Sequence, residues 1–258
     1  MATSTSAGTD ASTIKSEVKS GNSIAECLHK VLEDVKKAAT PGQPLPRVVA
    51  VSKMKTVADI LGAYHAGQRH FGENYVNELK EKANDPQLVQ LDDIKWHFIG
   101  HLQSNKSKIV CAIPNLWMME TVDSPNLATV LDSSVKKLDL PNPLRVMIQV
   151  NTSGEASKSG CEPDLCIQLV KHVIDTCPHL HLCGLMTIGS LGHDYTMGPN
   201  PDFECLVRFR DTVAKETGCS DLELSMGMSA DYVEAIKAGS NNVRVGSNIF
   251  GARQYPKK

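Results

Sequence analysis

Short runs of β-forming residues recur at nearly regular intervals along this chain, and each is followed by a segment of helical length. Eight such runs occur, at 48–52, 70–72, 96–100, 116–120, 146–150, 181–186, 222–225 and 243–246. Segments between them, for example 58–65, 165–174, 203–213 and 230–238, place apolar residues at the three- and four-residue steps of an amphipathic helix. Repeated strand-and-helix units of this kind predict an α/β fold, a single-domain (β/α)8 TIM barrel.

A doubly wound open sheet is the alternative architecture for an alternating pattern. That fold usually carries a Gly-x-Gly-x-x-Gly turn after its first strand, whereas this chain reads Ser52-Lys53-Met54-Lys55 there. No break in composition divides the 258 residues into two parts. The sequence therefore favours one barrel without a second domain.

The first 22 residues are rich in Ser, Thr, Ala and Gly, which predicts a flexible tail at 1–22 and a barrel domain over 23–258. The barrel is predicted to begin with an extra N-terminal helix, closed by Pro41-Gly42. Its apolar residues have helical spacing: Ile24, Leu28, Val31, Leu32 and Val35. A mitochondrial presequence would be rich in arginine, yet the first arginine is Arg47. We expect a cytoplasmic protein, with a mitochondrial fraction as the alternative.

Composition and charge exclude several classes of function. A formal net charge of −2 provides no basic field for nucleic acid. No stretch approaches the roughly 18 consecutive apolar residues that would span a membrane. The eight cysteines include no Cys-x-x-Cys pair, and the histidines include no His-x-x-x-His pair with an acidic neighbour. We therefore expect reduced thiols and no metal site.

Lys53 stands directly after the first predicted strand, where a parallel barrel delivers side chains to its mouth. Strand alternation puts it on the same face as Val49 and Val51, so it points into the mouth if those valines line the interior. An amine over an apolar interior loses solvation, which favours its neutral, nucleophilic form. Lys53 is therefore a candidate for imine chemistry, and the alternative is an ordinary solvated lysine at a strand end.

Two loops nearer the other end of the chain have the composition of a phosphate site. In SMGMS at 225–229, Gly227 allows close approach of the backbone, and Ser229 is predicted to cap the helix that starts near Ala230. Gly246 and Ser247 repeat this arrangement after the eighth strand, and capping without a ligand is the alternative. Loops seven and eight form the usual phosphate site of phosphate-binding barrels. A lysine and a phosphate site at one barrel mouth together indicate pyridoxal phosphate (PLP).

Arg244 has an unusual position, because strand alternation sets it opposite Val243 and Val245. If those valines pack outward, a guanidinium points into the barrel, where a charge must be paired. One interpretation is an internal ion pair with Glu73 or Glu223. The other is a hydrogen bond from Arg244 to the ring nitrogen of the cofactor. Since arginine does not readily give up its proton, that nitrogen would stay unprotonated and the cofactor would be a weak electron sink.

These residues resemble a known family, the pyridoxal phosphate homeostasis proteins, also called the YggS or proline synthetase co-transcribed family. The shared runs are VAVSK at 49–53, FGENY at 71–75, WHFIGHLQ at 96–103, GLMTIG at 184–189, SMGMSAD at 225–231, VRVGS at 243–247 and IFG at 249–251. The resemblance covers nearly everything after the tail. The chain departs from it by reading SKMKT at 52–56 where SKTKP is usual, and by Asn248 where Thr or Ser is common.

The resemblance implies a barrel similar to the N-terminal domain of alanine racemase, with PLP held as an internal aldimine on Lys53. It also implies that Ser229, Gly246 and Ser247 take the phosphate, and that Arg244 takes the ring nitrogen. Asn74 should lie near the ring, and we expect Met226 to pack against it as a soft filler. The expected cofactor-binding residues are Lys53, Asn74, Met226, Ser229, Arg244, Gly246 and Ser247, with no catalytic or metal-binding residue.

Three functions from different classes remain open. The first, which the resemblance favours, is a non-enzymatic PLP carrier that takes part in vitamin B6 homeostasis and passes PLP to apoenzymes. The second is a PLP-dependent amino-acid racemase, which needs a second base that alanine racemase takes from another domain and subunit. The third is a cofactor-free aldolase that forms an imine on Lys53. We expect PLP as ligand, transient contacts with apoenzymes, and a monomer or weak homodimer.

Overall fold

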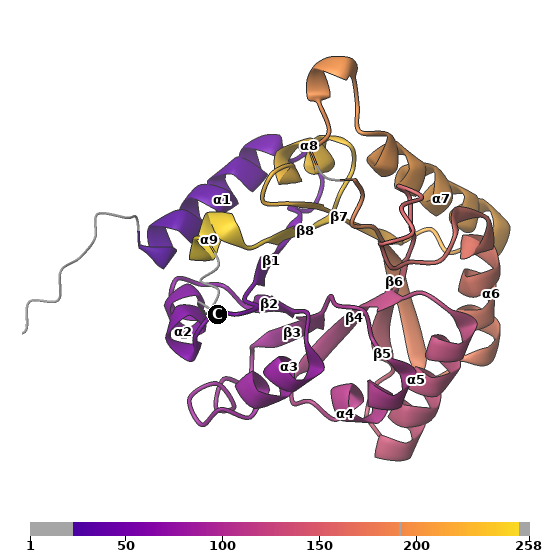
Figure 1. Ribbon diagram of the computed structural model, residues 1–258, viewed down its shortest axis with the longest axis horizontal. Helices are drawn as coiled ribbons and strands as arrows, with labels where there is room; N and C mark the ends of the chain where they lie inside the picture. The colour runs from indigo at the N-terminus through magenta and orange to yellow at the C-terminus, as the bar shows by residue number, and fades with distance from the viewer. Residues whose placement is uncertain (1–22, 191, 253–258) are drawn as a thin grey trace, which may run out of the picture.

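The computed structural model describes residues 23–190 and 192–252, so the predicted tail at 1–22 lies outside the described residues. Eight parallel strands within the described ranges close into a barrel in the order β1 to β8, and helices surround it (Figure 1). The strands are β1 (Arg47–Val51), β2 (His70–Glu73), β3 (Lys95–Phe98), β4 (Leu116–Val122), β5 (Leu144–Gln149), β6 (Leu180–Met186), β7 (Glu223–Met228) and β8 (Asn242–Val245). The prediction of a (β/α)8 barrel is confirmed.

The helices follow the strands along the chain and form the outer layer of the barrel (Figure 1). The α-helices are α1 (Ile24–Ala38), α2 (Val57–His65), α3 (Val76–Ala83), α4 (Ser107–Cys111), α5 (Pro125–Leu138), α6 (Cys166–Thr176), α7 (Pro201–Thr217), α8 (Tyr232–Lys237) and α9 (Ser247–Phe250). Short 3-10 turns are η1 (Ser104–Lys106), η2 (Pro163–Leu165) and η3 (Tyr195–Met197).

The predicted N-terminal helix is α1, and its start is fixed by a capping box. The Ser23 hydroxyl accepts from the backbone N–H of Glu26, and the Glu26 carboxylate accepts from the backbone N–H of Ser23. The helices α8 and α9 span only six and four residues, so α1 packs across both of them on that side of the barrel (Figure 1). The Tyr232 hydroxyl donates to the Asp34 carboxylate at 3.0 Å and joins α8 to α1.

Each predicted run overlaps one strand, and the largest difference lies at the end of β7. The prediction ended this strand at Ser225, whereas it continues to Met228 because Met228 pairs with Arg244 of β8. The longer strand also shifts the start of α8 from the predicted Ala230 to Tyr232.

Strand alternation divides the core into an outer and an inner part. The outward side chains, such as those of Val243 and Val245, pack with the helices in one continuous apolar core. Inside the barrel, Met118, Met147 and Met186 form a separate apolar cluster. Because the two valines of β8 face outward as predicted, the Arg244 side chain between them lies in the interior.

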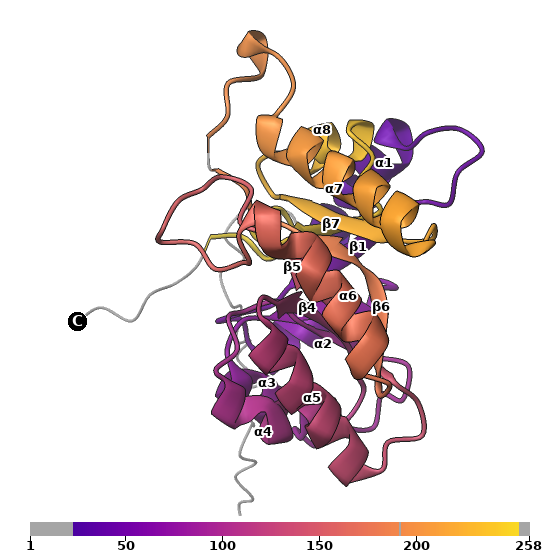
Figure 2. The same cartoon turned by 90° about the vertical axis from the view of Figure 1, so that its right-hand side faces the viewer.

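The connection from β6 to α7 extends well away from the barrel (Figure 2). Residues 192–199 form part of this connection. It carries Met197, which is 83% exposed. Over the described ranges, none of the helices is long and apolar enough to cross a membrane. The same ranges contain no group of three or more His, Cys, Asp or Glu residues that could hold a metal ion.

Candidate functional site

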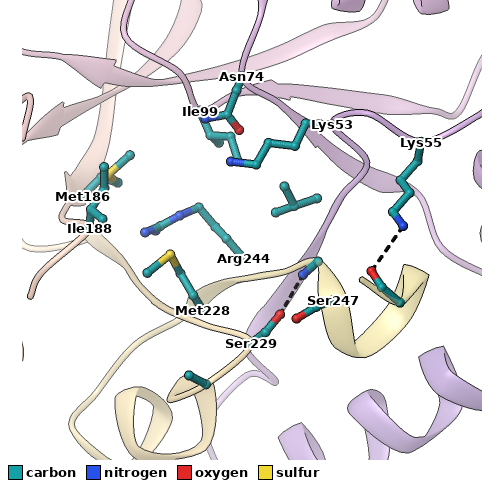
Figure 3. A pocket seen from close by; sticks show the side chains of 14 residues that line it. Lys53, Lys55, Asn74, Ile99, Met186, Ile188, Met228, Ser229, Arg244 and Ser247 are labelled. Carbon is teal, nitrogen blue, oxygen red and sulfur yellow. Dashed lines mark hydrogen bonds between the residues drawn. The ribbon is translucent and has the colours of Figure 1, made fainter. Parts of the chain in front are cut away.

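A cavity of about 340 Å³ opens at the carboxyl ends of the strands (Figure 3). Six of the predicted cofactor-binding residues line it: Lys53, Asn74, Ser229, Arg244, Gly246 and Ser247. The basic residues among those that line it are Lys53, Lys55 and Arg244, and its described lining includes no acidic residue. The cavity is therefore suited to an anionic ligand.

Lys53 follows β1, and its half-buried side chain is directed into the cavity (Figure 3). Val51, two residues earlier, lines the same cavity, as the alternation of the strand predicts. The backbone N–H of Ser52 donates to the carbonyl of Gly72 at 3.0 Å, so β1 and β2 remain joined up to the residue before Lys53. The amine is thus presented from a paired strand end.

Asn74 follows β2 and lines the cavity next to Lys53 (Figure 3). Its Oδ1 atom is buried and has no hydrogen-bond partner among the described residues. The main chain at this point is held close to the end of β3, where a Cβ on Gly100 would overlap the carbonyl oxygen of Asn74. A buried polar atom without a partner has a free-energy cost that a polar ligand group would remove.

Arg244 forms the base of the cavity, and only 4% of the residue is exposed. Its guanidinium donates to the carbonyl of Thr187 at 2.8 Å and to the hydroxyl of Ser225 at 2.5 Å. Burial lowers the pKa of Arg244, while the negative charges of Glu120 and Asp231 act in the opposite direction. The guanidinium is therefore a fixed, buried donor at the cavity floor.

The carboxylate that balances Arg244 is Glu120, a residue that was not predicted from the sequence. The hydroxyl of Ser225 donates to Glu120 at 2.6 Å and so bridges the two charges. Burial alone would raise the pKa of Glu120, but the hydrogen bond and charge of His97, the charge of Arg244 and the Ser225 hydroxyl hold it at about 2. The ion pairs considered from sequence, with Glu73 or Glu223, do not form, because these carboxylates pair with Lys82 and Arg47.

The loops after β7 and β8 are bound to each other. The hydroxyl of Ser229 accepts from the backbone N–H of Gly246 at 3.0 Å, and the Asn248 side chain donates to the carbonyl of Ser229 at 3.0 Å. The prediction that Ser229 caps the following helix is wrong. Asp231 occupies that position, and its carboxylate accepts from the backbone N–H of Met228 at 2.7 Å. The extra strand residues of β7 move Ser229 away from the helix and toward Gly246.

Met226 does not line the cavity. It is fully buried in the outer core, in the layer between the barrel and its helices. Met228 lines the cavity instead, together with Met186 from β6 (Figure 3). A β-bulge between Ser225 and Met228, where Gly227 has a φ of +93°, interrupts the strand alternation, so Met226 is buried in the outer core while Met228 lines the cavity. The expected contact of Met226 with a ligand therefore passes to Met228.

Lys55 also lines the cavity, although it was not among the site residues predicted from the sequence. Its amine donates to the carbonyls of Phe250, Gly251 and Ala252 at 2.8, 3.2 and 3.0 Å. These carbonyls lie at the end of α9, so Lys55 joins the loop after β1 to the segment that begins with Ser247. Its shared parity with Lys53 was a signal of its direction, but its partners are almost 200 residues away.

Other polar residues in or just after the predicted strands lie outside the cavity lining. His101 is largely exposed and lies 3.2 Å from the Asp123 carboxylate. Asn151 donates to the carbonyl of Glu155 in its own loop. His97 is fully buried, with Nδ1 donating to Glu120 and Nε2 paired with His70. These side chains stabilise the barrel and its loops.

The fold and the site define a class: a (β/α)8 barrel with a lysine after the first strand, an arginine on the floor of the mouth and two joined serine loops. The protein-family model described as "Alanine racemase, N-terminal domain" matches residues 28–254 of this chain. A pyridoxal phosphate homeostasis protein of Homo sapiens is 52% identical over 216 residues, covering 83% of this chain and 78% of that protein. The chain belongs to the family of pyridoxal phosphate homeostasis proteins.

Solved structures agree with this assignment. The structure of PipY from Synechococcus elongatus with PLP bound has a TM-score of 0.74 and 31% identity, covering 88% of this chain and all of that one. An alanine racemase of Clostridium difficile has a TM-score of 0.67 at 15% identity, covering 90% of this chain and 58% of that one. This second likeness shows that the two proteins share the barrel fold.

Proposed function

We propose that this protein binds PLP at the barrel mouth, covalently through Nζ of Lys53, and takes part in intracellular PLP homeostasis. The observation that carries the proposal is one cavity with the Lys53 amine on one side, the serine loops on another and a buried guanidinium on its floor. PLP has an aldehyde, a phosphate and a ring nitrogen, which match these three features. The PLP-bound PipY structure supports the same ligand class.

Each lining residue has a defined part in this proposal. The hydroxyls of Ser229 and Ser247 and the backbone at Gly246 hold the phosphate. Arg244 donates to the ring nitrogen and leaves it unprotonated, because a guanidinium retains its proton. The unpaired Oδ1 of Asn74 accepts a hydrogen bond from the polar edge of the ligand. Met228, and not Met226, packs against the ring.

We propose that the protein is a carrier and not an enzyme. Racemisation needs a second acid–base group across the ring from the lysine. Among the described residues that line the cavity, Lys55 is held by three carbonyls, Arg244 does not readily lose a proton, and the opposite wall holds Met186, Ile188 and Met228. PLP bound here is shielded from other amines. The described cavity lining provides no base that would deprotonate an amino acid.

A role as a PLP carrier implies partners and a cellular location. We propose that PLP passes from Lys53 to PLP-dependent apoenzymes during transient contacts, with the carrier a monomer or weak homodimer. We propose a cytoplasmic location, with a mitochondrial fraction as the alternative. A cofactor-free aldolase is a less favoured function than a PLP carrier, because without PLP the guanidinium of Arg244 would have no ring nitrogen to which it could donate.

The test is intact mass of the PLP-treated protein before and after borohydride reduction, followed by peptide mapping. Reduction should fix one PLP adduct on Lys53, and fragment ions should separate Lys53 from Lys55. The variant Lys53→Ala should lose this adduct and keep weak non-covalent binding. An adduct on another residue of the wild-type protein would show that Lys53 is not the attachment site. Negligible turnover of several amino acids is expected, and sustained racemisation that depends on Lys53 would overturn the carrier proposal.

A further inference from the structure

A buried lysine lies on α3, outside the cavity and next to the segment that carries Lys53. Only 7% of Lys82 is exposed. Its amine donates to the carbonyl of Ser52 at 2.7 Å, to the carboxylate of Glu73 at 2.7 Å and to that of Glu78 at 2.6 Å. We call Lys82, Glu73 and Glu78 the Lys82 cluster. None of its three members lines the cavity.

The Lys82 cluster holds both neighbours of Lys53. On one side, the hydroxyl of Ser52 donates to Glu73 at 2.7 Å, and its carbonyl accepts from Lys82. On the other side, the backbone N–H of Met54 donates to the same Glu78 oxygen that accepts from Lys82, at 2.6 Å. The residues before and after Lys53 are thus fixed to one ammonium group.

The backbone after Lys53 needs such a restraint. Met54 has a φ of +61°, in the left-handed region that a residue with a Cβ rarely occupies. Its conformation is unfavourable by itself, and the hydrogen bond to Glu78 stabilises the turn. If this bond were lost, the turn would relax and the direction of the Lys53 side chain would change.

Stability alone does not account for the Lys82 cluster. Its ammonium faces two carboxylates, and Glu73 is fully buried with one oxygen, Oε2, lacking a hydrogen-bond partner among the described residues. Replacing buried ionic groups by apolar side chains of similar volume is often neutral or stabilising. The cluster provides what apolar packing would not, namely hydrogen bonds that fix the backbone on both sides of Lys53.

We propose that Lys82 is a positioning residue for the covalent attachment of PLP to Lys53. This inference rests on the proposed function. In the reaction, the neutral Lys53 amine attacks the aldehyde carbon, a C=N bond replaces the C=O bond, and the oxygen leaves as water together with the two amine hydrogens. The rate depends on the placement of the amine, and a displacement of about 1 Å can cost about 100-fold. Phosphate binding uses other loops and does not depend on this placement.

The experiment separates the covalent step from non-covalent binding in Lys82→Met. The rate of attachment is measured by mixing with PLP, quenching with borohydride at set times and recording intact mass. Affinity is measured with a PLP analogue that carries a methyl group in place of the aldehyde. We expect attachment to slow by about 10- to 100-fold, with the affinity for the analogue within about twofold. Lys80→Met is the matched control, because Lys80 is exposed on the same helix, and it should attach PLP at the wild-type rate.

Equal attachment rates for Lys82→Met and wild type would overturn the inference, and so would a parallel loss of analogue affinity. If Lys82→Met fails to fold, Glu78→Ala decides the matter, because it removes the acceptor of the Met54 N–H at a more exposed position. It should slow attachment while leaving analogue affinity unchanged, and an unchanged rate would refute the positioning role. If the wild-type protein forms no adduct on Lys53, the proposed function fails, which is a different result from equal rates.

Discussion

Replacing Glu120 by Gln should destabilise the barrel strongly, because this carboxylate is the buried counter-charge of the site. Its oxygens accept hydrogen bonds from Nδ1 of His97 at 2.5 Å, the hydroxyl of Ser225 at 2.6 Å and the side-chain amide of Asn242 at 3.0 Å. Glutamine has nearly the same volume, but it removes the negative charge and one acceptor. Arg244 would then remain buried without the carboxylate that Ser225 links to it.

The magnitude follows from the pKa of Glu120. A carboxyl pKa of about 2 in the folded protein, against the ordinary 4.5, corresponds to about 3 kcal/mol of folding free energy at neutral pH. This agrees with the roughly 3–5 kcal/mol typical of breaking a buried ion pair from one side. We therefore expect Glu120→Gln to lower the free energy of unfolding by about 3 kcal/mol at pH 7. The unfolding temperature should fall by about 6–12 °C.

The pH dependence gives a second, independent measurement. Because the folded-state pKa is depressed, the contribution of Glu120 is complete above the unfolded value of 4.5 and is lost as the pH falls toward about 2. The stability difference between wild type and Glu120→Gln should therefore shrink as the solution is acidified below about pH 5. Urea unfolding followed by circular dichroism measures this difference at each pH.

Glu216→Gln provides the control, because the Glu216 side chain is 42% exposed and pairs with Lys171 on the surface. This substitution should cost less than about 1 kcal/mol. A difference below about 1 kcal/mol for Glu120→Gln at pH 7 would refute the reasoning. A large difference that stays constant between neutral and acidic pH would show that packing, and not charge, is lost.

Four further substitutions test other parts of the structure. Gly100→Ala should destabilise the protein by about 1–3 kcal/mol in urea, because the new Cβ overlaps the carbonyl of Asn74; an unchanged midpoint would contradict this close approach. Burial, with nearby positive charges, lowers the pKa of His70 to about 3, so only the unfolded chain takes up this proton as the pH falls below 6.5. His70→Asn should therefore weaken the loss of thermal stability between about pH 6.5 and 5, and an unaltered slope would count against it. Met228→Ala should reduce PLP affinity with little effect on folding, whereas Met226→Ala should cost about 2–5 kcal/mol of stability and leave affinity nearly unchanged; calorimetry and urea unfolding distinguish these outcomes.

Local periodicity predicted the side-chain directions in β1 and β8 correctly. Alternation from Val51 turns Lys53 into the mouth, and the outward valines of β8 turn Arg244 inward. These directions depend on the neighbouring residues of the same strand, which the sequence contains. The order of the strands and the presence of an N-terminal helix were also predicted from the sequence alone.

The end of β7 could not be predicted from the sequence in the same way. Its last residues pair with β8, and Met228 lies opposite Arg244. Strand length here depends on the neighbouring strand and not on the β-forming tendency of the run Ser225 to Met228, which contains a glycine. The capping role of Ser229 failed because the strand is longer, and the contact of Met226 failed because a β-bulge at Gly227 places Met228 at the cavity instead.

The sequence by itself determined the barrel, the presence of Lys53 and Arg244 at its mouth, and the two serine loops, because each follows from local periodicity and turn chemistry. Only the tertiary structure decided which partners hold those groups. Glu120 reaches Arg244 through Ser225 across the barrel interior, and Lys82 reaches Ser52 from a helix 30 residues away. Barrel closure brings these residues together. No sequence pattern indicates which distant residue pairs with a given charged side chain. The orientation of the Lys53 amine therefore depends on contacts that exist only in the folded chain.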